Sequence, residues 1–298
     1  MSEPTSPSSA SLAPPAAAAA TIRPLSTHDD LRACVELQRI TWGDAFADLV
    51  PASILKVSQR VGGVAAGAFD ADGRLLGFVF GLTGVERGCL VHWSDMLAVR
   101  EEARDMGLGR RLKEYQRDAV RALGATVIYW TYDPLVARNA HLNFNKLGVR
   151  AVEYVEEMYG DTDSDLHRGL GTDRFVVAWP VSRPESDALA AASARLASDG
   201  DAVREAPLIN PDLADGNVPN LELIDNARPT YLRVAIPCDI FAVKAHSLDF
   251  AGRWRQSTRR AFQWALARGY VVRGVYSDPG GEWSYYVLAS DPRATKES

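Results

Sequence analysis

A Gly-x-Gly loop between an apolar run and an amphipathic segment constrains this chain more than any other feature. The segment from Arg104 to Arg110 reads Arg-Asp-Met-Gly-Leu-Gly-Arg. It follows the apolar run 96–99 and opens an amphipathic stretch, 111–123, that predicts a helix. Glycines at such a junction let backbone N–H groups approach an anion, and the helix start adds unpaired donors and partial positive charge. The loop therefore predicts a site for a phosphate-bearing ligand, most simply a nucleotide-like cofactor.

Three other interpretations of the glycine loop can be compared with its sequence. A plain strand-to-helix turn needs no ligand and stays open, because two glycines alone need structural context. A nucleoside triphosphate loop would carry Gly-Lys-Ser or Gly-Lys-Thr, which this segment lacks. A dinucleotide fold would carry a third glycine and a downstream ribose-binding carboxylate, and both are missing from the expected places.

Composition is that of a globular protein with an ample core. The chain has 298 residues, of which 47% are hydrophobic and 24% charged. Its net charge of −5 argues against a general nucleic-acid surface. Cys34, Cys89 and Cys238 lack the spacing of a metal site and predict reduced thiols in a cytoplasmic protein without a metal. No run is long and apolar enough to span a bilayer.

The chain divides into segments of different character. Residues 1–20 are rich in Pro, Ser and Ala without the basic start of a signal peptide, which predicts a disordered extension. Residues 21–182 form the main domain, and 183–226 form a helix and a linker rich in Pro, Asn and Asp. Residues 227–292 predict a small subdomain of strand, helix and hairpin packed on the main domain, followed by a tail at 293–298.

The main domain is predicted to be an α/β fold built on a mixed sheet. Asp-Gly at 72–73 joins two apolar runs and indicates a hairpin. Strands are predicted at 21–25, 64–69, 75–82, 88–99, 125–131, 149–156 and 174–179, with helices after Ser26, near 54–57, over 111–123 and over 136–146. In the C-terminal part, strands are predicted at 231–237, 270–276 and 283–288, with a helix from Ser247 to about Arg268.

Three segments, in order and over residues 21–179, resemble the GNAT superfamily of N-acetyltransferases. They are the strand 96–99, an Arg/Gln-x-x-Gly-x-Gly loop at 104–109, and the run from Asn139-Ala140 through Phe144-Asn145-Lys146-Leu147-Gly148. The last looks like the family's Asn-Ala and Phe-Tyr-x-x-Leu-Gly segment. The resemblance implies an α/β (α+β) fold with a mixed, mostly antiparallel sheet flanked by helices, here with a small C-terminal α/β extension. It also implies acetyl-CoA, or another acyl-CoA, as cofactor.

The resemblance further implies where the cofactor lies. Acyl-CoA would occupy the place where strands 88–99 and 125–131 separate, and its pantetheine arm would pair with the strand as a peptide does. The pyrophosphate would lie on the glycine loop. Lys146 could reach the adenosine phosphate of the cofactor, and a solvent-facing lysine without a ligand is the alternative. The implied cofactor-binding residues are Leu97, Ala98, Val99, Arg104, Met106, Gly107, Leu108, Gly109, Arg110, Asn139, Asn145 and Lys146.

Direct acyl transfer, the chemistry of this family, needs a base for the attacking amine and donors for the oxyanion. Candidate catalytic residues are His92, Asp95 and Asp133, with Tyr132 placed to meet the substrate. A structural histidine and a turn cap are the alternatives for His92 and Asp133. Many relatives have a tyrosine general acid where this chain has Asn145, and asparagine cannot supply a proton at a useful pKa. The general acid therefore stays unassigned.

Two arginines of the C-terminal helix, Arg255 and Arg259, are four residues apart and share a helix face. Their guanidinium groups could hold the carboxylate of an amino-acid acceptor or of a diacid acyl group. A solvated charged face is the alternative.

The sequence thus predicts an acyl-CoA-dependent N-acyltransferase, with acetyl-CoA as the first donor and a small-molecule amine or amino acid as acceptor. The alternatives are a succinyl-CoA-type acyltransferase, a non-catalytic acyl-CoA-binding sensor and a protein-modifying acetyltransferase, the last without a charged docking run to support it. No nucleic-acid or membrane partner is expected. The oligomeric state stays open, with a homodimer among the options.

Overall fold

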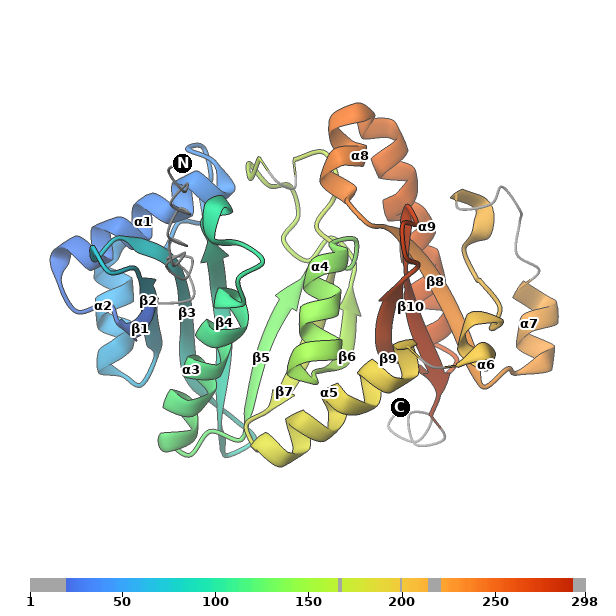
Figure 1. Ribbon diagram of the computed structural model, residues 1–298, viewed down its shortest axis with the longest axis horizontal. Helices are drawn as coiled ribbons and strands as arrows, with labels where there is room; N and C mark the ends of the chain where they lie inside the picture. The colour runs from blue at the N-terminus through green and yellow to red at the C-terminus, as the bar shows by residue number, and fades with distance from the viewer. Residues whose placement is uncertain (1–19, 166–167, 199, 214–220, 292–298) are drawn as a thin grey trace, which may run out of the picture.

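The computed structural model describes residues 20–165, 168–198, 200–213 and 221–291. The extension predicted for residues 1–20 lies outside these ranges except for Ala20, which is buried. The predicted tail and residues 214–220 of the predicted linker also lie outside them. Two sheets follow one another along the long axis of the molecule, a larger one from residues 21–180 and a smaller one from residues 231–290 (Figure 1).

The larger sheet has seven strands in the order β1-β2-β3-β4-β5-β7-β6. Neighbouring strands pair antiparallel except β4 and β5, which are parallel. The mixed, mostly antiparallel sheet predicted from the sequence is therefore confirmed. Its strands are β1 (Thr21–Pro24), β2 (Val64–Phe69), β3 (Leu75–Glu86), β4 (Cys89–Val99), β5 (Val127–Tyr132), β6 (Arg150–Val155) and β7 (Arg174–Pro180).

Helices cover the two faces of this sheet unequally. On one face α1 (His28–Trp42) and α2 (Ala52–Arg60) pack on β2, β3 and β4. The opposite face carries α3 (Leu108–Ala122), α4 (Ala137–Ala140) with the π-helix η2 (His141–Leu147), and α5 (Arg183–Ser198), with the short η1 (Glu101–Ala103) before α3. A capping box starts α1, because the Thr27 side chain accepts from the backbone N–H of Asp30 at 3.0 Å and Asp30 accepts in return.

The smaller sheet has three antiparallel strands in the order β8-β10-β9. They are β8 (Tyr231–Pro237), β9 (Tyr270–Ser277) and β10 (Trp283–Ser290), and α9 (Leu248–Leu266) packs on them. Ser247 caps α9 as predicted, accepting from the N–H of Phe250 at 3.1 Å. Four short helices of the C-terminal part were not predicted from the sequence: α6 (Asp201–Arg204), η3 (Pro211–Leu213), α7 (Leu221–Ala227) and α8 (Ile240–His246).

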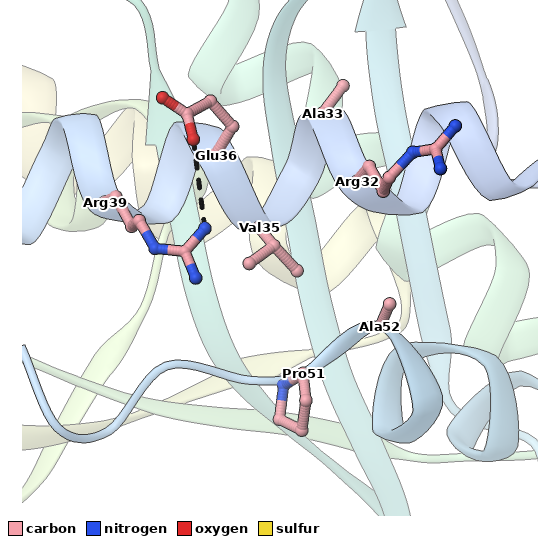
Figure 2. A pocket seen from close by; sticks show the side chains of 7 residues that line it. All are labelled: Arg32, Ala33, Val35, Glu36, Arg39, Pro51 and Ala52. Atoms are coloured by element: carbon pink, nitrogen blue, oxygen red, sulfur yellow. Dashed lines mark ion pairs between the residues drawn. The ribbon is translucent and has the colours of Figure 1, made fainter. Parts of the chain in front are cut away.

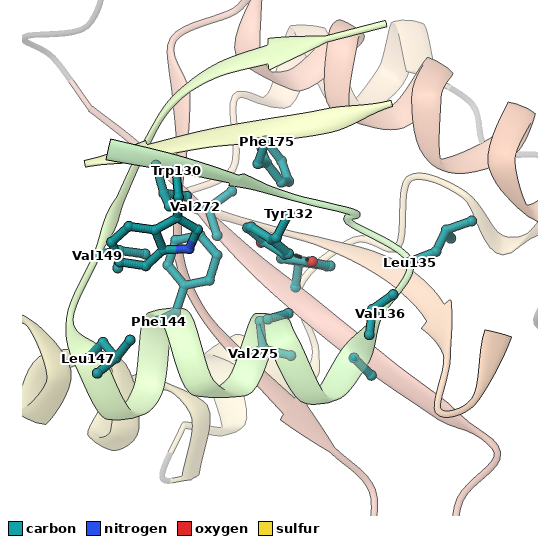
Figure 3. Packing of buried hydrophobic residues seen from close by; sticks show 14 of the residues in the cluster. Trp130, Tyr132, Leu135, Val136, Phe144, Leu147, Val149, Phe175, Val272 and Val275 are labelled. Carbon is teal, nitrogen blue, oxygen red and sulfur yellow. Dashed lines mark hydrogen bonds between the residues drawn. The ribbon is translucent and has the colours of Figure 1, made fainter. Parts of the chain in front are cut away.

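An aromatic core joins the two sheets. The ring of Phe175 in β7 lies 4.8 Å from that of Phe262 in α9, and Phe262 lies 5.1 Å from Tyr286 in β10. Figure 3 shows Tyr132 of β5 and Phe144 of η2 turned into this same core. Each buried aromatic ring contributes roughly 2 kcal/mol or more by burial alone. The C-terminal part therefore shares its interior with the main domain.

The helix predicted over 136–146 departs from a regular α-helix. Its second half is the π-helix η2, which ends at Gly148 with φ +70°. A Cβ on Gly148 would lie 2.1 Å from the Ser186 carbonyl of α5, so only glycine allows this close passage. The wider π turn changes which side chains face the sheet, and it turns Asn145 toward β9.

Candidate active site

Strands β4 and β5 pair over only part of their length. Their parallel ladder covers three pairs and ends at Trp93 and Tyr129. Beyond that point the strands diverge (Figure 1), and residues 94–99 of β4 have no ladder partner on the β5 side among the described residues. We call this divergence, beyond Trp93 and Tyr129, the fork. Backbone groups on the open edge of β4 can bind an extended, amide-containing ligand.

A bulge in β4 lies at the fork. In the pairing with β3, Phe80 faces Met96 whereas Gly81 faces Ser94, so Asp95 is the extra residue. The bulge reverses the alternation of side chains along β4. Before it, Ser94 lies on the α3 face, and after it the α3 face is lined by Leu97 and Val99. Ala98 packs on the opposite face with α1 and α2.

The glycine loop lies directly after β4 and starts α3. Asp105 has φ +61° and Gly107, the N-cap of α3, has φ +76°. No side chain caps this helix, and no acidic residue lies in its first turn. The N–H groups of residues 108–110 therefore have no intrahelical acceptor and are oriented for an anion. Met106 is 40% exposed, so the loop is open to solvent.

Basic side chains flank the loop. Arg104 Nε donates to the carbonyl of Val99 at 3.4 Å, and Arg110 Nε donates to Glu114 at 2.9 Å. Both arginines are exposed. They add positive charge beside the unpaired N–H groups without blocking them.

The space between α3, β4 and η2 narrows at Gly109. A Cβ there would lie 3.9 Å from both Leu97 and Leu142, which is ordinary contact distance. Asn139 and Lys146, expected to bind the cofactor from the following helix, are exposed on α4 and η2. Leu108 is buried and anchors the start of α3 in the core.

Asn145 lies elsewhere than the fork. Its Nδ2 donates to the Val275 carbonyl at 2.6 Å, and its Oδ1 accepts from the Val275 N–H at 3.2 Å. The side chain is buried and both its polar atoms bind β9. The described contacts of Asn145 are thus those of a connector between η2 and the smaller sheet.

His92 is buried beneath α3 with both ring nitrogens bonded. Because the Thr83 hydroxyl donates to the Gly62 carbonyl, it accepts from His92 Nδ1–H at 2.9 Å. His92 Nε2 in turn accepts from the Gln116 amide at 3.0 Å. Burial, with a smaller contribution from Lys113, lowers the pKa of His92 to about 4. The imidazole is neutral and buried, and protein groups bind both of its nitrogens. These surroundings fit the structural histidine that was the alternative expected for His92.

Asp95 is in a different situation. It is exposed on the face opposite His92. Its pKa is raised, first by desolvation in its surroundings and then by the nearby charge of Asp48 in the connection between α1 and α2. A carboxylate with a raised pKa therefore lies at the bulge of the fork.

Asp133 and Tyr132, at the end of β5, face inward. Asp133 forms a bidentate pair with Arg255 at 2.9 and 2.6 Å, and it lies 3.9 Å from Arg174. The Tyr132 hydroxyl lies 3.1 Å from that of Tyr286 within the aromatic core. Both residues are at most 5% exposed. The substrate-binding role expected for Tyr132 and the general-base role expected for Asp133 therefore do not fit their surroundings.

Arg259 also binds protein carboxylates. Its guanidinium contacts Asp173 at 2.6 and 2.8 Å, Glu156 at 2.5 Å and Glu157 at 2.5 Å. Asp173 raises the pKa of Arg259 first through its hydrogen bonds. Neither Arg255 nor Arg259 thus presents a free guanidinium face to a substrate, because Arg255 binds Asp133 at the end of β5 and the Leu170 carbonyl, and Arg259 binds carboxylates of the connection between β6 and β7.

The other face of β5 carries hydroxyl groups that sequence reasoning missed. The Tyr129 hydroxyl donates to Glu86 at 3.1 Å, and Thr131 Oγ1 lies 2.8 Å from the hydroxyl of Tyr159. Alternation along the strand places Tyr129 and Thr131 opposite the core residues of β5 and on the same side as Asp95. Only their alternation with buried residues could have indicated this face in advance.

An open groove lies on α1, away from the fork (Figure 2). It has a volume of 520 Å³ and no arrangement of a nucleophile with a base. Its charged side chains include Glu36 and Arg39, whose groups are 3.8 Å apart. The lining residues are Arg32, Ala33, Val35, Glu36, Arg39, Pro51 and Ala52.

Among the described residues, no three His, Cys, Asp or Glu side chains are arranged to hold a metal ion. In the same part of the chain, every helix is too short or too polar to cross a membrane.

No protein-family model matches the chain, and no curated protein matches it. Solved structures with a similar arrangement include a chain of the NatC complex bound to Gag peptide and CoA, with 15% identity over 55% of this chain and 99% of that chain and a TM-score of 0.46. The ribosomal-protein-S18-alanine N-acetyltransferase from Escherichia coli has 21% identity over 55% of this chain and 94% of its own, with a TM-score of 0.42. An aminoglycoside 6′-N-acetyltransferase complexed with coenzyme A has 17% identity over 54% and 97%, with a TM-score of 0.41.

Proposed function

We propose that this chain is an acyl-CoA-dependent N-acyltransferase, with acetyl-CoA as its donor and a small-molecule amine or amino acid as its acceptor. The observation that carries the proposal is the continuity of the fork with the glycine loop. The open edge of β4 leads from the bulge at Asp95 to the uncapped start of α3 within one short stretch of chain. An anion site and a peptide-like edge in series suit a ligand with a pyrophosphate and an amide-containing arm.

In this proposal, different residues between the loop and the fork bind different parts of acyl-CoA. The N–H groups of residues 108–110, with Arg104 and Arg110, bind the pyrophosphate. The backbone of Leu97 and Val99 holds the pantetheine arm, which lies along roughly 16 Å of strand between the loop and the fork. The thioester, which supplies an acyl group activated for transfer to an amine, then lies at the fork.

Asp95 is proposed as the general base. It takes a proton from the attacking amine, and its raised pKa makes it a stronger base than an ordinary aspartate. His92 and Asp133 are not part of this proposal, because protein groups occupy both side chains.

The chemistry of the open face favours a cationic acceptor. Asp95 interacts with Asp48, and Glu86 binds Tyr129 on the same side of the sheet. These carboxylates attract the ammonium group of an acceptor. After deprotonation they can accept hydrogen bonds from the neutral amine and so orient it. The hydroxyl groups of Thr131 and Tyr159 add hydrogen-bonding partners for a polar acceptor. We also propose a cytoplasmic location, since the three cysteines among the described residues are free thiols.

Binding and thiol release test the proposal together. Acetyl-CoA and succinyl-CoA are titrated by calorimetry, and free thiol is then measured with a panel of amines, amino acids and peptides with free N-termini. Binding of acetyl-CoA with thiol release on small amines supports the proposal. Binding without release over the whole panel would instead identify a sensor, and release with peptides alone would identify a protein-modifying enzyme.

A loop variant checks the assignment of the cofactor site. A Cβ at position 109 lies at an ordinary contact distance of 3.9 Å from Leu97 and Leu142, so we expect the fold to accept Gly109→Val, whose branched side chain extends beyond that Cβ. We expect acetyl-CoA affinity to fall at least about tenfold. Gly252→Ala, in an open position on α9, is the matched control and should leave affinity unchanged. Equal affinity in Gly109→Val and the wild type would overturn the cofactor site.

A further inference from the structure

Lys113 occupies the vertex of the fork. It lies in the second turn of α3 and is 3% exposed. Its Nζ donates to Ser94 Oγ at 2.7 Å and lies 3.6 Å from the ring centroid of Trp130. Ser94 and Trp130 are the first residues of β4 and β5 beyond the last ladder pair. The amino group is therefore held between the two strands at the point where they separate.

Among the described residues, no compensating anion lies beside Lys113. No carboxylate forms an ion pair with it in the described part of the chain. The titratable and charged groups near it are His92 on β4, which is neutral, and Arg117 one turn further along α3. Arg117 lies over Trp179, and Trp179 packs edge to face on Trp130. Burial lowers the pKa of Lys113 well below its usual range.

A buried amine without an anion is costly for the fold. An apolar side chain at the same place would pack against Trp130 without the desolvation penalty. The buried cations Arg255 and Arg174 lie beside the Asp133 carboxylate, whereas the buried Arg117 donates to Ser186 Oγ and, like Lys113, forms no ion pair with a carboxylate among the described residues. What distinguishes Lys113 is its place where the two strands of the fork separate, and this place indicates a role beyond packing.

We propose that Lys113 is the general acid of the acyl transfer and protonates the departing thiolate of coenzyme A. This inference rests on the proposed function, which brings the thioester to the fork. When the C–S bond breaks, its electron pair stays on sulfur, and a proton passes from the ammonium Nζ to that sulfur. The proton that Asp95 removes from the amine goes to solvent, and Lys113 recovers a proton from solvent after the products leave.

The chemistry of the two groups is matched. A thiol has a pKa near 8.5, about two units below an ordinary lysine. A lysine whose pKa is lowered by burial transfers its proton to a thiolate with a smaller free-energy penalty than an ordinary lysine does. The resemblance implies a general acid at position 145, but this chain has asparagine there, and the Asn145 side chain binds the backbone of Val275. Lys113 reaches the same reaction centre from α3.

The decisive measurement compares coenzyme A with desulfo-coenzyme A, which lacks the sulfur. Their affinities are measured by calorimetry from pH 6 to pH 9 for the wild type and for Lys113→Met, an apolar residue of similar length. In the wild type coenzyme A should bind more tightly than desulfo-coenzyme A, and this preference should depend on pH, since the Lys113 amine and the thiol exchange a proton and the ammonium stabilises the bound thiolate. In Lys113→Met this pH-dependent preference should be lost, and kcat with acetyl-CoA should fall by about 10²-fold or more.

Gln116→Met is the matched control, since Gln116 is also buried on α3 but contacts His92 within the paired part of β4. It should keep the pH-dependent preference. Ser94→Ala, which removes the hydrogen bond but keeps the amine, should reduce kcat less than Lys113→Met does. The same pH-dependent preference in Lys113→Met and the wild type would overturn the role of Lys113 alone. Absence of coenzyme A binding in the wild type would overturn the proposed function itself.

Discussion

The Asp133 carboxylate and the Arg255 guanidinium form a bidentate ion pair that joins the end of β5 to α9. The two residues are 122 positions apart in the chain, and their N–O distances are 2.9 and 2.6 Å. Their side chains are only 2% and 3% exposed. Asp133 also accepts from the Leu135 N–H at 2.9 Å and lies 3.9 Å from Arg174. Each charge in this cluster depends on the others for compensation, because water does not reach them.

Asp133→Asn should lower the free energy of unfolding by about 3–5 kcal/mol, because it leaves Arg255 and Arg174 buried without an anion. Arg255→Met should cost less, since Arg174 remains beside Asp133. The double variant should lose less than the sum of the two single losses. Urea denaturation of the four proteins measures these differences. If Arg255→Met had wild-type stability and a raised KM for the acceptor, Arg255 would instead bind the acceptor, as the sequence had predicted.

Asn145→Ala should lower the free energy of unfolding by about 2–3 kcal/mol, because it leaves the Val275 N–H and carbonyl without their buried partners. Acetyl-CoA affinity should stay within about twofold of the wild type. Asn139→Ala should show the reverse pattern, with stability kept and affinity reduced, because Asn139 is exposed on α4. Denaturation and calorimetry on both variants give the comparison. A loss of affinity in Asn145→Ala at unchanged stability would contradict the connector role.

Local patterns were sufficient to predict the main sheet and the start of α9. Asp-Gly at 72–73, the apolar run before Arg104 and the Ser247 cap each act within a few residues, and the corresponding elements formed as expected. The π-helix η2 was not predicted, and the contacts that accompany it are the close passage of α5 over Gly148 and the hydrogen bonds of Asn145 with β9. Such contacts come from distant parts of the chain and leave no local period.

The site was predictable only where it is built from consecutive residues. The glycine loop is continuous in sequence, whereas Asp133 and Arg255 meet across 122 positions. Lys113 was overlooked, although it shares the helix face of the buried Leu112 and Gln116. A lysine on the buried stripe of an amphipathic helix was the available signal, and its partners on β4 and β5 became evident only from the fold.

Stability should depend on pH through His92. Burial, with a smaller effect of Lys113, lowers its folded pKa to about 4, while an unfolded histidine titrates near 6.5. Between these values the unfolded state binds a proton that the folded state excludes, so stability falls as pH decreases through this window. The loss should approach roughly 3 kcal/mol at pH 4. Urea denaturation from pH 7 to pH 4 measures it.

The His92 contribution is isolated by comparison with a variant. His92→Gln removes the titrating group, so its stability should decrease less between pH 6.5 and pH 4 than that of the wild type. His246→Gln, at an exposed position in α8, should follow the wild-type curve. Parallel curves for His92→Gln and the wild type would mean that carboxylates alone account for the pH dependence.

The acidic limb of the rate profile should belong to Asp95. A base must be ionised to accept a proton, so kcat/KM should rise with pH through the raised pKa of Asp95. Asp48→Asn removes a nearby negative charge that raises this pKa, and it should therefore move the acidic limb to lower pH. Asp95→Asn should lower kcat by about 10²–10⁴-fold and abolish the limb.

Profiles of kcat/KM from pH 4.5 to pH 8 for the three proteins separate the base from a merely nearby charge. Asp44→Asn, another exposed aspartate in the connection between α1 and α2, is the matched control for Asp48→Asn and should leave the limb in place. If Asp95→Asn kept both the rate and the limb of the wild type, another group would be the base. A limb that shifted to higher pH in Asp48→Asn would contradict repulsion between the two carboxylates, since removing a negative neighbour can only make Asp95 easier to ionise.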